Sequence, residues 1–66
     1  MIPKESALRI LAVIEEEREK ENAASPTGKS LSDFSYRLIA AHIAKASGYT
    51  CRDEWMDELR RMNQNV

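Results

Sequence analysis

Residues 31–47 read LSDFSYRLIAAHIAKAS and decide the fold. At 100° per residue, a helix over this stretch carries two apolar stripes on opposite sides. One stripe comprises Leu31, Phe34, Leu38 and Ala41, and the other comprises Tyr36, Ile39, Ala40 and Ile43. Because each stripe has to be covered by another apolar surface, the pattern predicts two packing partners for this helix.

The residues beside this stretch indicate where the helix begins and ends. Ser30 and Asp33 have the spacing of a capping box with Asp in place of Glu, and Ser32 is a competing N-cap. Gly48 can take the left-handed conformation that follows the last turn of a helix. We therefore expect a middle helix over about residues 32–47.

Upstream, Pro3 suits the first turn of a helix, and the apolar residues after it recur on one side. A first helix is expected over about residues 4–21. Its second half, residues 15–21, reads EEEREKE and has no apolar residue, but pairs such as Glu16 with Lys20 favour a helix. This half is predicted to project into solvent or to meet a partner.

A third helix is predicted over about residues 51–62, because Thr50 and Asp53 repeat the capping signal just before it. Its apolar residues fall on one side, and they are Cys51, Trp55, Leu59 and Met62. A one-sided stripe places this helix at the edge of the fold. Residues 63–66 are expected to form a flexible tail.

These elements predict an all-α fold with one small helical domain over residues 1–66. The simplest arrangement is a three-helix bundle with the middle helix between the other two, and half of an intertwined homodimer is the alternative. Domains of about 60 residues bury only about 60% of their unfolded surface and are marginally stable. Association with a partner would relieve that shortage of core.

Composition excludes several function classes. The chain has 10 Lys and Arg against 11 Asp and Glu, a balance unlike that of most nucleic-acid-binding domains. Its longest apolar run, residues 10–14, is far shorter than a membrane span and lacks the flanks of a signal peptide, so a cytoplasmic protein is expected. A chain of 66 residues is also shorter than the scaffold of about 100 residues that carries most cofactor-dependent enzymes, so we expect no enzyme.

The two residues with reactive side chains, one histidine and one cysteine, give little further evidence about function. His42 is a candidate proton acceptor and Cys51 a candidate reactive thiol. One Cys and one His cannot form a disulfide or a zinc site of four protein ligands, so no cofactor or metal is expected. His42 is predicted to be partly buried or interfacial, and Cys51 to pack with the stripe of the third helix.

Residues 23–30 read AASPTGKS and match a loosened phosphate-binding loop, with Lys29 and Ser30 at the positions for phosphate and magnesium. Such a loop has to follow a buried strand, whereas an acidic helix is expected here. Consecutive helix breakers, including Pro26, instead favour an interhelical loop over residues 22–31.

The middle and third helices, with their Ser-Gly-Tyr-Thr connection, resemble a helix-turn-helix DNA-binding unit over about twenty residues. The matching residues are Ile43, Ala44, Gly48 and Tyr49. Glu54 and Asp57 depart from the pattern, because the motif has apolar residues there. The resemblance implies DNA binding, and the basic residues available for it are Lys29, Arg37, Lys45 and Arg52.

The leading hypothesis is a small non-enzymatic helical regulator or adaptor that binds protein, either a second copy or a larger target. Its expected interface comprises Phe34, Tyr36, Ile39, Ile43 and Trp55. Charged residues at 15–21 and 60–61 are expected to set orientation and association rate. A minimal helix-turn-helix transcriptional regulator is the alternative. The same apolar residues suit a core or an interface, so the oligomeric state stays open.

Overall fold

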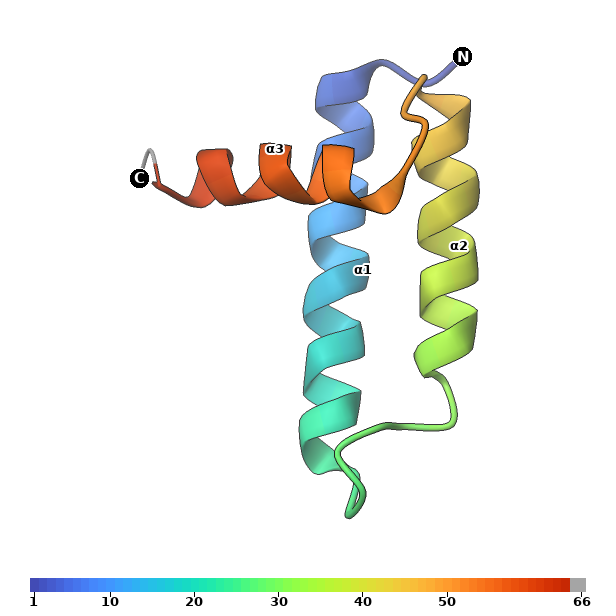
Figure 1. The fold of residues 1–66 in the computed structure, drawn as a ribbon, viewed down its shortest axis with the longest axis vertical. Helices are drawn as coiled ribbons and strands as arrows, with labels where there is room; N and C mark the ends of the chain where they lie inside the picture. Colours follow the sequence, from blue (N-terminus) through green and yellow to red (C-terminus); the bar gives the residue numbers. More distant parts are fainter. Residues whose placement is uncertain (65–66) are drawn as a thin grey trace.

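The computed structural model describes residues 1–64, which form three helices and no strand. They are α1 (Lys4–Ala24), α2 (Asp33–Ala46) and α3 (Arg52–Gln64). The predicted all-α three-helix fold is confirmed. α1 and α2 lie side by side as an antiparallel hairpin, and α3 lies crosswise over the end of the hairpin that holds the N-terminus (Figure 1).

The apolar core lies where α3 crosses the hairpin. Trp55 of α3 and Leu11 of α1 are its largest fully buried side chains. The complete set of buried apolar residues is Ala7, Leu8, Leu11, Ala40, Ala44, Tyr49, Trp55 and Leu59. Only alanines and Tyr49 come from α2 and the segment after it, so the large aliphatic residues of α2 contribute little to this core.

α1 begins after Pro3, whose carbonyl accepts a hydrogen bond from the Ala7 N–H at 2.9 Å. The helix continues past its expected end to Ala24, because alanine is the strongest helix former. Ser25 then turns to an extended conformation, with φ −82° and ψ 137°. Pro26 disfavours helical geometry at the residue before it, which explains the end at this point.

α2 ends in the way that Gly48 predicts. The φ of Gly48 is +99°, a conformation that side chains other than glycine's rarely adopt. The Tyr49 N–H donates to the carbonyl of Ala44 at 3.0 Å, and the Gly48 N–H donates to that of Lys45 at 3.1 Å. These two bonds form a Schellman motif, which satisfies carbonyls at the helix end and turns the chain toward α3.

The predicted cap of α2 is wrong. Ser32 occupies the N-cap position but makes no side-chain cap hydrogen bond. The Ser30 hydroxyl accepts instead from the Ser32 N–H at 3.2 Å. Asp33 does not close a capping box, because its carboxylate accepts hydrogen bonds from Asn22 and Arg18 of α1.

α3 is also capped differently from the prediction. Glu54, not Asp53, accepts from the N–H and the hydroxyl of Thr50, at 2.8 and 3.2 Å. The hydrogen bond from the Thr50 N–H lowers the pKa of Glu54. The helix runs through Gln64, so residues 63 and 64 of the expected tail are helical, and residues 65–66 lie outside the described residues.

The expected place of the middle helix between the other two is wrong. α1 contacts α3 directly, and both pack on the side of α2 that carries Ala40 and Ala44. The opposite side of α2 is covered by neither. The helices of residues 1–64 include none that is long and apolar enough to cross a lipid bilayer.

Candidate functional site

Between the apolar core and the interhelical loop, the hairpin is joined by charged groups rather than by apolar side chains. Asp33, at the start of α2, is 3% exposed. Its Oδ1 accepts hydrogen bonds from Asn22 Nδ2 at 2.9 Å and from Arg18 Nη1 at 3.0 Å, and both donors belong to α1. Its Oδ2 accepts from Arg37 Nε at 2.9 Å. The bonds from Asn22, Arg18 and Arg37 hold the pKa of Asp33 well below its ordinary value.

Glu15 is the second buried carboxylate of this region and is 5% exposed. It accepts hydrogen bonds from Arg18 at 3.0 and 3.4 Å and a further one from Arg52 of α3. The bond to Glu15 raises the pKa of Arg18. The Asp33 cluster therefore links all three helices, and its members are Glu15, Arg18, Asn22, Asp33, Arg37 and Arg52.

The predicted solvated extension of α1 is thus wrong for Glu15 and Arg18. Their angular positions lie on the side of α1 that faces α2, whereas Glu16, Glu17 and Lys20 are exposed. No buried side-chain nitrogen or oxygen within residues 1–64 lacks a hydrogen-bond partner. Charged groups can be buried in a small fold when each of their polar atoms has a hydrogen-bond partner.

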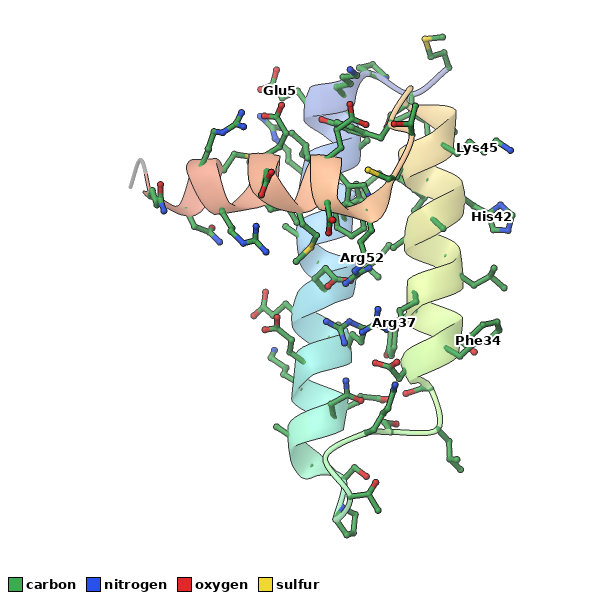
Figure 2. All side chains as sticks on the ribbon, viewed as in Figure 1. Glu5, Phe34, Arg37, His42, Lys45 and Arg52 are labelled. Atoms are coloured by element: carbon green, nitrogen blue, oxygen red, sulfur yellow. The ribbon has the colours of Figure 1, made fainter. Side chains whose placement is uncertain are left out.

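The outer face of α2, which points away from α1, exposes apolar side chains, whereas the interior of this part of the hairpin buries charged ones. We define this face by four large exposed apolar residues, which are Leu31, Phe34, Leu38 and Ile39. Phe34 is 71% exposed, and in Figure 2 its ring points away from α1, on the same side as His42. Their exposed neighbours are Ser35, Ala41 and His42.

This face has almost no charge. Within residues 31–44 the charged side chains are Asp33 and Arg37, and these two form an ion pair at 2.9 Å on the inner side of the helix. Lys45 lies at the end of the face. Exposed apolar patches without charge mark interaction sites more often than exposed residues that stand alone.

The predicted interface residues separate into three groups. Phe34 and Ile39 lie on the outer face of α2. Tyr36 and Ile43 are half-buried, and Ile43 packs against the core. Trp55 is 2% exposed and belongs to the core, so it is removed from the surface.

Leu31 and Leu38 are exposed on the same face but were not among the predicted interface residues. The sequence pattern could have identified them, because Leu31 and Leu38 form one apolar stripe with Phe34. The inner side of α2 is filled by alanines and by the Asp33 cluster, which leaves these large apolar residues exposed.

The four basic residues named for DNA binding are mostly engaged with carboxylates. Arg52 pairs with Glu15, Arg37 with Asp33 at 2.9 Å, and Lys29 with Asp33 at 3.9 Å. Lys45 makes no ion pair within the described part of the chain. The first turn of α3 presents acidic residues, Asp53 and Glu54.

The segment that matches a phosphate-binding loop follows helix α1 and is bound internally. The hydroxyls of Ser25 and Thr27 both donate to the carbonyl of Lys29 at 3.1 Å. The Ser30 N–H donates to Asn22 Oδ1 at 2.7 Å. Because the loop's polar groups bind one another, they do not form an open cradle for a phosphate.

His42 and Cys51 are both exposed, which corrects the predicted packing of Cys51 and the predicted partial burial of His42, while an interfacial His42 stays a prediction. His42 lies on the side of α2 that no helix covers, and Cys51 precedes the first turn of α3. No group of three or more His, Cys, Asp or Glu side chains within residues 1–64 is arranged to hold a metal ion.

Comparison of the chain with models of known protein families, with characterised proteins and with solved structures gives no match. Fold and surface together define a small three-helix protein with charged groups inside one end of its hairpin and an uncharged apolar face on α2.

Proposed function

We propose that this chain is a small non-enzymatic helical regulator or adaptor that binds protein through the outer face of α2. The observation that supports this is the exposure of four large apolar side chains on a face without charge. Covering such a face releases water from apolar surface, the main driving force of protein association.

The large apolar residues of the outer face are not buried within the monomer. Asp33 and Arg18 fill the space between α1 and the first turns of α2, so Phe34 and Leu38 face outward. A Leu or Phe side chain left in water forgoes about 1.5–3 kcal/mol relative to full burial. A partner that covers the face recovers part of this free energy.

The spacing of Leu31, Phe34 and Leu38 is three and then four residues, which is typical of the anchors by which a helix docks on an apolar surface. The large residues lie toward the start of α2, and the small Ala41 lies further along. Two copies packed with antiparallel α2 helices would set large side chains against small ones, in the self-complementary way that two-fold dimers require. We therefore take a second copy of the chain as the first partner to test.

The test is the molar mass in solution, measured by light scattering over a series of protein concentrations. The chain is expected to dimerise, and Phe34→Ser is expected to remain monomeric while its helical circular dichroism is retained. Val13→Ser is the matched control, because Val13 is also an exposed apolar residue but lies on α1. Equal association of the two variants would contradict the proposal.

A monomeric wild type at all concentrations would exclude a second copy and direct the test to a different protein. Affinity capture with the wild type, Phe34→Ser and Val13→Ser as baits then compares partners directly. A partner retained by the wild type and Val13→Ser but lost by Phe34→Ser is expected. Failure to find this pattern would exclude the outer face of α2 as the binding surface.

One observation favours the alternative of DNA binding, namely the crosswise arrangement of α2 and α3 around the turn at Gly48. Asp53 and Glu54 in the first turn of α3 would repel the phosphates there. We expect no binding to duplex DNA at low salt. Binding that falls steeply with salt and weakens in Lys45→Glu would replace the present proposal with this alternative.

A further inference from the structure

A groove of about 670 Å³ lies between the second half of α2 and the start of α3, next to the outer face of α2. Three of its lining residues are basic, Arg37, Lys45 and Arg52, and none is acidic. Arg37 and Arg52 extend toward one region in front of the hairpin, while Lys45 extends from the outer side of α2 (Figure 2). The rim is therefore cationic although the whole chain has a net charge of −1.

The two arginines retain free donors. Arg37 uses Nε for Asp33, and Arg52 uses Nη2 for Glu15, with no other hydrogen bond recorded for either within residues 1–64. A guanidinium has five N–H donors, so each has several left for a ligand. Their carboxylate partners hold both side chains in place, and Lys45 adds a charge that no carboxylate neutralises.

The floor of the groove is apolar and aromatic. Ala41, Ala44, Tyr49 and Trp55 contribute to it. Arg52 stacks over the Trp55 ring, with its guanidinium carbon 4.9 Å from the ring centroid, so this indole is covered by Arg52 and the exposed apolar surface of the floor comes mainly from Ala41. The volume lies within the range of about 300–1,000 Å³ that is typical of small-molecule sites.

We infer that this groove binds a small aromatic molecule that carries a carboxylate, sulfonate or phosphate group. The anionic group pairs with the free N–H groups of the two arginines, Lys45 adds positive charge at the rim, and the ring lies on the apolar floor. The groove adjoins the outer face of α2 at Ala41 and Lys45, but Leu31, Phe34 and Leu38 do not line it.

The experiment compares two fluorescent probes of similar shape, anilinonaphthalene sulfonate, which is anionic, and N-phenylnaphthylamine, which is neutral. The anionic probe is expected to bind about tenfold more tightly, because hydrogen bonds to charged groups are the strongest. The single cysteine locates the site, because Cys51 is exposed and lines the groove. The bound anionic probe is expected to slow alkylation of Cys51 by iodoacetamide, a neutral reagent.

Lys45→Gln is expected to weaken binding of the anionic probe about fivefold, the effect of one exposed ion pair. Lys20→Gln is the matched control on α1, and Phe34→Ser tests whether the probe binds the outer face of α2 instead; neither change is expected to alter its affinity. Equal affinity for both probes, unprotected Cys51, or equal effects of Lys45→Gln and Lys20→Gln would each overturn the inference. Loss of binding in Phe34→Ser would overturn it as well.

Discussion

The two ends of the α1–α2 hairpin are built on opposite principles. Beneath α3, apolar residues such as Leu11 and Trp55 are inside and polar residues are outside. At the other end Glu15, Arg18 and Asp33 are inside, and Phe34 is in solvent. The comparison indicates that α2 uses its alanines for folding and leaves most of its large apolar residues exposed, where the proposed partner would cover them.

The difference also concerns how each end gains stability. Burial of apolar surface stabilises the end beneath α3 without demanding precise geometry. At the Asp33 cluster, Coulomb attraction is largely offset by the cost of removing charges from water. What that cluster contributes is specificity, because each carboxylate is satisfied only when α1 and α2 pair in this register.

The largest effect is expected from removal of Trp55. Trp55→Ala leaves a cavity where α3 packs on the hairpin and is expected to cost about 3–5 kcal/mol. A domain of this size has a total stability of only a few kcal/mol. We expect thermal denaturation monitored by circular dichroism to find this variant largely unfolded at 25 °C. Met62→Ala, a change at an exposed residue of the same helix, should leave the melting temperature almost unchanged.

Breaking the charged end is expected to have the next largest effect. Glu15→Ala leaves Arg18 and Arg52 without their carboxylate, and loss of one partner in a buried pair costs about 3 kcal/mol. Glu16→Ala, one position along, removes an exposed carboxylate and should change stability by less than about 0.5 kcal/mol. Urea denaturation measures the difference. Equal urea midpoints for these neighbouring variants would contradict the role given to the Asp33 cluster.

Acid is expected to weaken the charged end through Asp33. The pKa of Asp33 is lower in the folded chain than its ordinary value of 3.8, so its contribution to stability is fully present above that value. The contribution is lost as the pH falls below 3.8 toward the folded pKa. Urea midpoints between pH 7 and pH 2 should therefore fall less in Asp33→Asn than in the wild type. Identical pH profiles would show that the carboxylate is not held by its hydrogen bonds.

The smallest effect on folding is expected on the outer face of α2. Phe34→Ser removes an aromatic ring that the monomer does not bury, so monomer stability should change by less than about 0.5 kcal/mol. The measurement is the urea midpoint at a protein concentration below the dimerisation range. A loss comparable to that of Trp55→Ala would mean that Phe34 belongs to the fold and not to an interface.

Local signals predicted the helices well and the contents of their interfaces poorly. Pro26 and Gly48 act on their own stretch of backbone, so the break after α1 and the end of α2 were readable from neighbouring residues. The capping roles of Ser30 and Asp33 were not, because a carboxylate near an N-terminus has several donors within reach. Asp33 bonds to Arg18, 15 residues away, in preference to its own backbone.

The amino-acid sequence by itself determined three helices, their breaks and the presence of two apolar stripes on α2, because these depend on residues within a few positions of each other. Only the tertiary structure decided which stripe is buried and that Glu15 lies inside. Burial is settled by groups far apart in the chain, such as Glu15 and Arg52, which are 37 residues apart and meet only when α3 crosses the hairpin. The same packing leaves Leu31, Phe34 and Leu38 uncovered, because α1 and α3 both lie on the side of α2 that carries Ala40 and Ala44.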